Sequence, residues 1–295
     1  MKQNCNICPR MCNVDRTIST GFCRSKNKAI VSKVMLHHFE EPPISGTQGS
    51  GAIFFSSCTL KCIYCQNYEI STECSGKEVS VETLADLFKQ LENAGAHNIN
   101  LVTPTHFTDQ IIDALNVYHP QIPIIWNTSG FERTETIKRL NGYVDIFLSD
   151  FKYYSNELSE NLSLAPTYFD ECSKATLEMR NLQPEDIFEN GLMKKGLIIR
   201  HLTLPNQTKD SEKIIDWIYT NLGNKTYLSL MSQYTPMGKV EKYPEMNRKI
   251  KPIEYKILTN KLNSLGFTNV FLQDFSSASD EFTPDFSEIK SDFKY

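Results

Sequence analysis

The amino-acid sequence predicts an α/β protein in which parallel strands and helices alternate and wind into a partial barrel. The main observation is a series of short runs rich in apolar and β-branched residues, each of a length suited to a buried parallel strand. These runs lie near residues 52–57, 98–103, 122–127, 143–149, 197–203, 226–232 and 268–273. Segments with helical periodicity separate most of them. Right-handed crossovers between such strands produce a parallel sheet rather than an antiparallel sandwich.

The helical segments carry apolar residues on one face and recognisable signals at their ends. Ser80 is a predicted N-cap for a helix whose apolar residues follow at 3.6-residue spacing as far as Gly95. The next stripe ends before Pro120, and two later stripes end before Gly223 and Gly266. Their apolar residues are Ile111, Ile112, Leu115 and Tyr118, then Ile214, Ile215, Ile218 and Leu222, and finally Ile257, Leu258, Leu262 and Leu265.

The bulk properties predict an ordinary cytoplasmic protein. The chain has 295 residues, of which 40% are hydrophobic and 22% charged, which is enough for one large domain. A net charge of −4 does not favour general nucleic-acid binding. The N-terminus lacks the apolar core of a secretory signal, and no run approaches the roughly 18 apolar residues of a membrane span. We therefore expect a cytoplasmic location, no membrane contact and reduced cysteines.

Residues 1–30 form a predicted metal-binding segment. They contain Cys5, Cys8, Cys12 and Cys23 but no sustained apolar periodicity, so metal would have to replace a hydrophobic core. Four thiolates suit tetrahedral zinc or an auxiliary Fe–S cluster, and redox-active or unbound cysteines are the remaining alternative. Residues 31–50 follow as a predicted lead-in loop, because their Pro and Gly residues oppose regular structure.

Cys58, Cys62 and Cys65 dominate the functional interpretation, because they stand in the order C-x3-C-x2-C directly after the first predicted strand. A cubane Fe–S cluster normally takes four Cys ligands, so three closely spaced ones leave an iron open to a ligand that is not protein. Zinc is the alternative, with Cys74 as a fourth ligand. A zinc site usually presents paired C-x2-C knuckles, however, and only Cys62 and Cys65 are spaced in this way.

The later predicted strands also end in polar residues, where the active groups of a parallel α/β fold gather. Part of this polarity is ordinary, since strands end where the chain meets water. The candidate site residues at these ends are Thr103, Thr105, Asn127, Ser129, Asp150, Lys152 and Arg200.

The three-cysteine loop after the first strand resembles the signature of the radical S-adenosylmethionine (SAM) superfamily. Tyr64 stands where that family has an aromatic residue beside the SAM adenine. More narrowly, residues 40–71 are similar to an uncharacterised branch related to pyruvate formate-lyase activating enzymes. The likeness includes Cys8-Pro9-Arg10 near the start and Ser276-Ser277 near the end. It implies a partial (β/α)6-type barrel over residues 51–275, followed by a C-terminal tail over 276–295.

This resemblance implies a [4Fe–4S] cluster whose open iron is chelated by SAM. An electron from a flavodoxin or ferredoxin would cleave SAM to methionine and a 5′-deoxyadenosyl radical, which removes a hydrogen atom from a substrate. The branch suggests a glycyl residue of a partner protein as substrate, and a peptide, an RNA or a small metabolite are alternatives. A non-catalytic Fe–S electron carrier or interaction protein is the alternative from another class.

The resemblance also implies where SAM is bound. Relatives usually end the second strand in a Gly-Gly-Glu-like turn that binds the SAM amine, and here Thr103 and Thr105 would serve instead. Asn127 and Ser129 lie in the stretch that helps to form a cation site in activating enzymes. Asn127 replaces the Asp of that stretch, which removes a negative charge from the cation site.

Two further strand ends complete the implied SAM site. Asp150-Phe151-Lys152 matches the Asp-x-Lys of activating enzymes, and such a charged pair suits the zwitterionic methionine end of SAM. Arg200 would offer its guanidinium to the SAM carboxylate.

Overall fold

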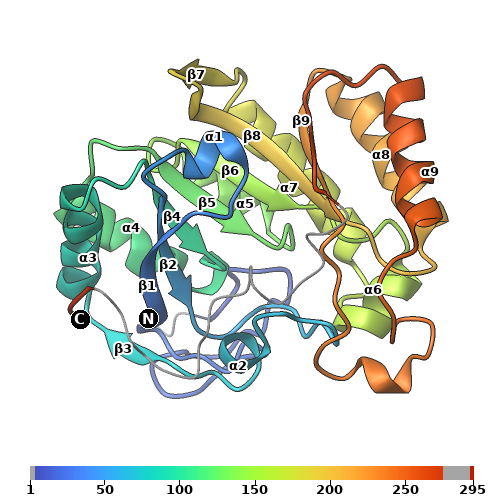
Figure 1. Ribbon diagram of the computed structural model, residues 1–295. Coiled ribbons are helices and arrows are strands. Elements are labelled where there is room, and N and C mark those ends of the chain that lie inside the picture. The colour runs from blue at the N-terminus through green and yellow to red at the C-terminus, as the bar shows by residue number, and fades with distance from the viewer. Residues whose placement is uncertain (1–3, 275–292) are drawn as a thin grey trace.

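The computed structural model describes residues 4–274 and 293–295, which form one mixed sheet with helices packed along it (Figure 1). The strand order is β10-β9-β8-β6-β5-β4-β2-β1-β3, and β7 pairs with β8. The strands are β1 Ala29–His37, β2 Ser50–Phe55, β3 Lys77–Val79, β4 Ile99–Val102, β5 Ile124–Thr128, β6 Ile146–Asp150, β7 Ile187–Glu189, β8 Leu192–Leu202, β9 Tyr227–Met231 and β10 Val270–Leu272.

The parallel part of this sheet is the predicted fold. Parallel pairing joins β2, β4, β5, β6, β8, β9 and β10 in that order. Every residue of β2, β4 and β5 is buried. Parallel strands that are covered on both faces are mostly apolar, which explains why these strands could be recognised in the sequence. The α/β class with a parallel sheet is therefore confirmed, and each predicted strand overlaps an observed one.

Helices connect the parallel strands and bury the apolar faces that were predicted. Ser80 caps α3, since its Oγ accepts a hydrogen bond from the N–H of Thr83 at 3.1 Å. Ile257 differs from the prediction, because it is 37% exposed on α9 whereas Leu258 and Leu262 are buried. The α-helices are α1 Pro42–Ser45, α2 Tyr68–Ser71, α3 Val81–Asn93, α4 Thr108–Val117, α5 Thr134–Lys138, α6 Asn156–Ser163, α7 Tyr168–Leu182, α8 Thr208–Leu222 and α9 Pro252–Ser264, with 3-10 turns at Thr105–Phe107 and Val240–Lys242. Across the described ranges, none of these helices has the length and apolarity to cross a bilayer.

Residues 31–50, which we predicted to be an irregular lead-in loop, contain regular structure instead. Most of β1 and the whole of α1 lie in this range. β1 pairs antiparallel with β2 and β3, and it is only partly buried, with polar Ser32 and Lys33 interrupting its apolar residues. A search for continuous apolar runs misses a half-buried strand of this kind. The prolines begin α1, where a missing N–H costs little.

The direction of the parallel strands fixes where a site can form. The arrowhead of β2 points toward α2 and the N-terminal segment, residues 4–28, whereas α1 lies at the opposite end of the sheet (Figure 1). The carboxyl ends of the strands and the N-terminal segment therefore share one end of the molecule.

The predicted C-terminal tail, residues 276–295, lies outside the described residues except for its last three positions, and the Ser276-Ser277 likeness falls outside them as well. Nζ of Lys77 in β3 donates to the Tyr295 carbonyl at 2.5 Å, and Nε2 of Gln90 in α3 donates to the Lys294 carbonyl at 3.0 Å. These last residues thus lie against β3 and α3.

Candidate active site

The carboxyl ends of the parallel strands surround a cavity of about 220 Å³. The structure brings the ends of β2, β5, β6 and β8 together here, as the strand-end rule requires. The residues that the sequence proposed as cluster or SAM ligands and that line this cavity are Cys62, Tyr64, Cys65, Asn127, Asp150, Lys152 and Arg200.

The three cysteines lie in the loop that follows β2, residues 58–65, which we call the cluster loop. Each sulfur has a hydrogen-bond partner outside the set: the N–H of Leu60 for Cys58 at 3.3 Å, the hydroxyl of Ser163 for Cys62 at 2.9 Å, and the hydroxyl of Ser71 for Cys65 at 3.2 Å. Hydrogen bonds to a ligating sulfur favour the thiolate and tune the potential of a cluster.

Burial makes these thiols hard to ionise without a cation beside them. Desolvation raises the pKa of Cys58 to about 12, and desolvation also raises the pKa of Cys65. Repulsion from Cys62 adds to both shifts, so the three sulfurs lie within electrostatic reach of one another. Iron supplies the positive charge that three convergent thiolates need. The donor set therefore fits a three-cysteine [4Fe–4S] cluster.

The described part of the chain contains no group of three or more His, Cys, Asp or Glu side chains placed to hold a single metal ion. An Fe–S cluster distributes its thiolates over several iron atoms, so this finding concerns mononuclear sites such as zinc.

Arg200, at the end of β8, is the centre of a buried charge network in the cavity wall. Its Nε donates to Oδ1 of Asp150 at 2.8 Å, its Nη1 to Oε2 of Glu40 at 3.0 Å, and its Nη2 to Oδ1 of Asn127 at 2.6 Å. Burial disfavours its charge, but the carboxylates of Asp150 and Glu40 outweigh burial and raise the pKa of Arg200. The guanidinium assigned to the SAM carboxylate is thus engaged by the protein on three of its nitrogens.

Lys152 carries a second positive charge into the same cavity. Its Nζ lies 2.6 Å from Oδ2 of Asp150, so this carboxylate bridges two cations. Burial would raise the pKa of Asp150, but Arg200 and Lys152 together lower it. Burial would lower the pKa of Lys152, but Asp150 and the Cys62 thiol raise it. Both groups are therefore charged at neutral pH.

Glu40 is a site residue that sequence reasoning missed. It enters from the amino-terminal end of the parallel strands, because β1 is antiparallel to β2 and ends beside its first residue. Its Oε1 accepts from the amides of Asn100 at 2.9 Å and Asn127 at 3.1 Å. A search of strand carboxyl ends cannot find such a residue. The available signal was an acidic pair, Glu40-Glu41, with no Lys or Arg between residues 34 and 60 to neutralise it locally.

Tyr64 is buried beside the cluster loop and held by other aromatic side chains. Its ring centroid lies 5.8 Å from that of Tyr234, and its hydroxyl lies 2.5 Å from that of Tyr153. Tyr153 in turn contacts Oγ of Ser163 at 2.6 Å, and Ser163 donates to Cys62. Desolvation raises the pKa of Tyr64 well above its usual value, so this chain of hydroxyls stays protonated.

Thr103, Thr105 and Ser129 do not line this cavity, and their proposed contacts to SAM stay predictions. The Thr105 hydroxyl donates to Oε1 of Glu132 at 2.6 Å, and the Ser129 carbonyl accepts from the hydroxyl of Tyr168 at 2.7 Å. Thr103 has a φ of +60°, which is unusual for a β-branched residue. Glu132 is fully buried and was also missed, since it does not follow a strand directly.

The family model described as the radical SAM superfamily matches residues 52–218, which is more than half of the chain. The chain belongs to the radical SAM superfamily. The matched range begins in β2 and contains the cluster loop, and membership of this family implies a [4Fe–4S] cluster and SAM. Members of this superfamily are enzymes, and the prediction of an enzyme is confirmed.

A related protein agrees with the predicted placement in an uncharacterised branch. Uncharacterized protein MJ0674 of Methanocaldococcus jannaschii is 33% identical over 257 residues, which cover 84% of this chain and 71% of that protein.

Two solved structures align with this one over most of the chain. SuiB of Streptococcus suis, bound to its precursor peptide SuiA, has a TM-score of 0.51 and 12% identity over 75% of this chain. Native anSMEcpe with bound AdoMet has a TM-score of 0.47 and 16% identity over 71% of this chain. This chain spans 48% of the SuiB chain and 57% of the anSMEcpe chain.

The other three N-terminal cysteines lie within electrostatic reach of Cys8. All four are free thiols. Burial raises the pKa of Cys8 to about 12, and repulsion from Cys23, Cys5 and Cys12 contributes to the shift. Four thiolates have the chemistry to bind zinc or an Fe–S cluster, although the described residues hold no preformed site for a single metal ion here either.

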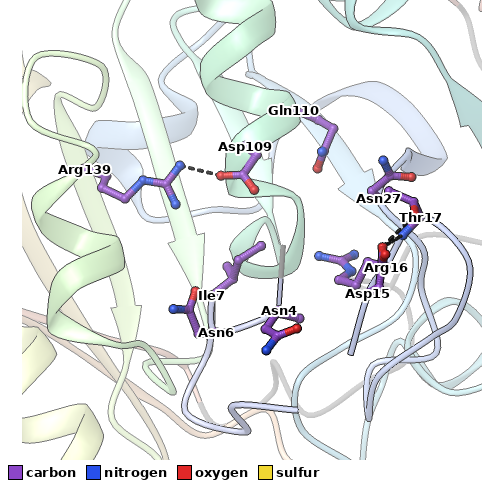
Figure 2. A pocket seen from close by; sticks show the side chains of 11 residues that line it. Asn4, Asn6, Ile7, Asp15, Arg16, Thr17, Asn27, Asp109, Gln110 and Arg139 are labelled. Atoms are coloured by element: carbon purple, nitrogen blue, oxygen red, sulfur yellow. Dashed lines mark hydrogen bonds and ion pairs between the residues drawn. The ribbon is translucent and has the colours of Figure 1, made fainter. Parts of the chain in front are cut away.

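A second cavity, of about 170 Å³, lies between the N-terminal segment and α4 (Figure 2). Its charged groups are engaged with each other or with the backbone. Asp109 pairs with Arg139, and Oδ1 of Asp15 accepts from the hydroxyl of Thr17 at 2.6 Å. Arg16 donates to three backbone carbonyls, including that of His106. We assign this cavity no function.

Proposed function

We propose that this protein reductively cleaves SAM at a [4Fe–4S] cluster on Cys58, Cys62 and Cys65 and removes a hydrogen atom from a protein or peptide substrate. One observation carries the proposal. Two of the three converging cysteines open onto the same cavity as the ionised pair Asp150 and Lys152. An electron carrier has no need for a cavity of this kind.

The charged groups suit the amino-acid end of SAM. Lys152 offers an ammonium group to a carboxylate, and Asp150 keeps that ammonium ionised and in place. Arg200 bonds to Asp150 and Asn127, and Glu40 accepts from Asn127, so these groups are oriented before a ligand binds. When bound, the cluster and SAM supply the one-electron chemistry and the hydrogen abstraction, while the protein orients and shields them.

The rest of the cavity wall suits the protection of a reactive species. Phe54, Val102, Leu202 and Met231 also line it. Apolar side chains limit the water near the reacting atoms and strengthen the electrostatic contacts within the cavity.

The proposed substrate is a polypeptide, with a glycyl residue of a partner protein as the specific case. The likeness to activating enzymes supports this choice, and the SuiB structure shows a radical SAM enzyme of similar fold bound to a peptide. We propose a flavodoxin or ferredoxin as the electron donor, and zinc or an auxiliary Fe–S cluster at Cys5, Cys8, Cys12 and Cys23.

Cysteine variants test the cleavage reaction. Replacing Cys58, Cys62 or Cys65 by Ala is expected to abolish 5′-deoxyadenosine formation from SAM in the dithionite-reduced protein, because the cluster loses a ligand. Cys74→Ala is the matched control, since Cys74 lies nine residues after Cys65 and would be required only by a four-ligand zinc site. Undiminished 5′-deoxyadenosine from the first three variants would refute the proposal, as would its absence from the reconstituted wild type.

The substrate class is tested by transfer of deuterium. Polypeptide, RNA and metabolite fractions prepared from cells grown with deuterated precursors are added separately to the reduced enzyme and SAM. Deuterium in 5′-deoxyadenosine from the polypeptide fraction alone is the expected result. Deuterium from the RNA or metabolite fraction alone would overturn the choice of substrate but not the cleavage reaction.

A further inference from the structure

Arg10 lies between Cys8 and Cys12 in the sequence and reaches the cluster loop in the structure. Its Nε donates to the carbonyl of Thr59 at 2.9 Å. Its Nη1 donates to the carbonyl of Leu164, just past the end of α6. One guanidinium of the N-terminal segment thus binds two separate parts of the barrel.

The end of α6 is itself bonded to the cluster loop. The N–H of Lys61 donates to the carbonyl of Ser163 at 3.2 Å, and the N–H of Ile63 donates to the carbonyl of Leu162 at 2.9 Å. The Ser163 hydroxyl also donates to Cys62. By binding Thr59 on one side and the end of α6 on the other, Arg10 links the two stretches that hold Cys62.

The position of Arg10 depends on the fold of the N-terminal segment. Its guanidinium carbon lies 3.7 Å from the ring centroid of Phe22, the residue before Cys23, and 5.2 Å from that of Phe131. The N–H of Phe22 donates to Sγ of Cys12 at 3.3 Å. A cation between two rings is well held only while both rings stay in place. The arrangement of the N-terminal cysteines therefore decides where Arg10 stands.

Arg10 also lies within the electrostatic influence of both cysteine groups. Burial lowers its pKa, and Cys8, Cys58, Cys12 and Cys62 oppose that shift. A positive charge between two groups of thiolates attracts both, and partial burial strengthens this attraction relative to water.

We propose that Arg10 is a positioning residue through which metal at the four N-terminal cysteines secures the [4Fe–4S] cluster of the cluster loop. Metal fixes the segment that carries Phe22 and Arg10, and Arg10 then fixes Thr59 and the end of α6 around Cys62. The inference rests on the proposed occupation of both cysteine groups. It goes beyond that proposal because it makes retention of one metal group depend on the other.

Variants at Arg10 test this dependence in the anaerobically reconstituted full chain. Arg10→Gln removes the charge and the branched donors, Arg10→Lys keeps the charge alone, and Lys28→Gln is the control. Lys28 belongs to the same segment but pairs with Glu78 of β3 at 3.6 Å, away from the cluster loop. We measure iron, sulfide and zinc per chain, the rate of cluster loss to an iron chelator, the SAM-dependent EPR signal and the midpoint potential.

The variants are expected to differ in their rates of cluster loss. Arg10→Gln loses the SAM-responsive cluster about tenfold faster than wild type, the effect of roughly one charge-assisted hydrogen bond. Its midpoint potential is more negative, because a positive charge near the cluster favours the reduced form. Arg10→Lys keeps the wild-type potential but loses the cluster at an intermediate rate, and Lys28→Gln matches wild type. Cys12→Ser, which disturbs the N-terminal site, loses the SAM-responsive cluster as fast as Arg10→Gln.

Two outcomes would overturn the inference. The first is an Arg10→Gln protein that is folded by circular dichroism and keeps wild-type EPR, potential and cluster lifetime. The second outcome applies if Arg10→Gln does not fold. It is a wild-type cluster lifetime in a Phe22→Leu variant, which removes only the stacking ring. A wild type without any SAM-responsive cluster refutes the proposed function itself, so the two failures can be told apart.

Discussion

Arg200 joins side chains from both ends of the barrel. Asp150 and Asn127 reach it from neighbouring strand ends, and Glu40 reaches it from the amino-terminal end. Its side chain is 15% exposed, and those of Asp150 and Glu40 are 14% and 10% exposed. Buried ion pairs of this kind add little stability over an apolar contact, but removing one partner leaves the other charges buried and unpaired. Loss of any one of these contacts is therefore expected to destabilise the network.

Arg200→Lys is expected to lower the free energy of unfolding by about 2–4 kcal/mol, because one ammonium cannot satisfy three divergent acceptors. SAM binding should weaken as well, since Asp150 and Asn127 lose their fixed positions. Denaturant titration and equilibrium binding of SAM to the anaerobic protein measure the two effects.

Arg180→Lys provides the matched control for this experiment. Arg180 pairs with Asp186 at 3.1 Å, with side-chain exposures of 20% and 15%, and neither residue lines the cavity. Its replacement should lower the free energy of unfolding and leave SAM affinity unchanged. Wild-type SAM affinity in Arg200→Lys would show that the network does not organise the site.

At the scale of elements, the start of α9 shows how a helix end is fixed by one carboxylate. Glu254 accepts from the N–H groups of Lys251 and Asn206 at 2.7 Å each. Arg248 donates to both of its oxygens, also at 2.7 Å. Hydrogen bonds from Arg248 are the main cause that lowers the pKa of Glu254 to about 2.

Glu254→Gln is expected to destabilise the protein by about 1 kcal/mol at pH 7, a modest value because solvent screens a partly exposed pair. The folded pKa of about 2 lies below the ordinary value of 4.5, so the ionised form contributes stability above pH 4.5. That contribution is lost as the pH falls toward 2. Unfolding curves of wild type and variant should therefore converge in acid.

Glu241→Gln is the control for the acid titration, because Glu241 is exposed in the turn before this region. Its stability should follow that of wild type at every pH. A constant gap between wild type and Glu254→Gln down to pH 2 would contradict ionisation as the cause.

The elements that could be predicted from the sequence are those with a simple local pattern. Parallel strands such as β5 are covered on both faces, and helices such as α3 carry a cap and an apolar stripe, so each is visible in a short window. β1 was missed because its partners impose a half-buried pattern that its own residues do not reveal. The strand-end rule found Asp150, but it could not find Glu40, whose place depends on an antiparallel neighbour. The same rule also selected Thr105, whose hydroxyl donates to buried Glu132 and which does not line the cavity.

At the scale of the whole molecule, the N-terminal segment is attached to the barrel mainly through side chains that bond to backbone. Arg10, Arg16 and Arg24 donate to carbonyls of the barrel, and Arg133 and Thr136 donate back to the carbonyls of Asn6 and Ile7 at 2.5 Å each. Within the segment, the buried hydrophobic residues are Cys8 and Cys23. Its order therefore depends on what those cysteines bind.

Removal of metal from the N-terminal cysteines is expected to raise amide hydrogen exchange in residues 4–28 by about tenfold or more, because local opening no longer breaks metal bonds. Exchange in β5 and β6 should be unchanged, since those strands lie in the apolar core. Hydrogen–deuterium exchange with mass spectrometry, before and after anaerobic chelation, measures both regions. Equal protection of residues 4–28 in the two states would show that the segment folds without metal.

The hydroxyl groups of Ser71 and Ser163 have a consequence for the energy at which this protein accepts an electron. Each contacts a sulfur from a helix that carries no iron ligand itself, Ser71 from α2 and Ser163 from α6. Weakening or strengthening such a contact changes the electron affinity of the cluster while every coordinating cysteine stays in place. With the proposed cluster in place, the reducing power of the enzyme would therefore be adjustable by single substitutions at two serines that do not themselves line the cavity.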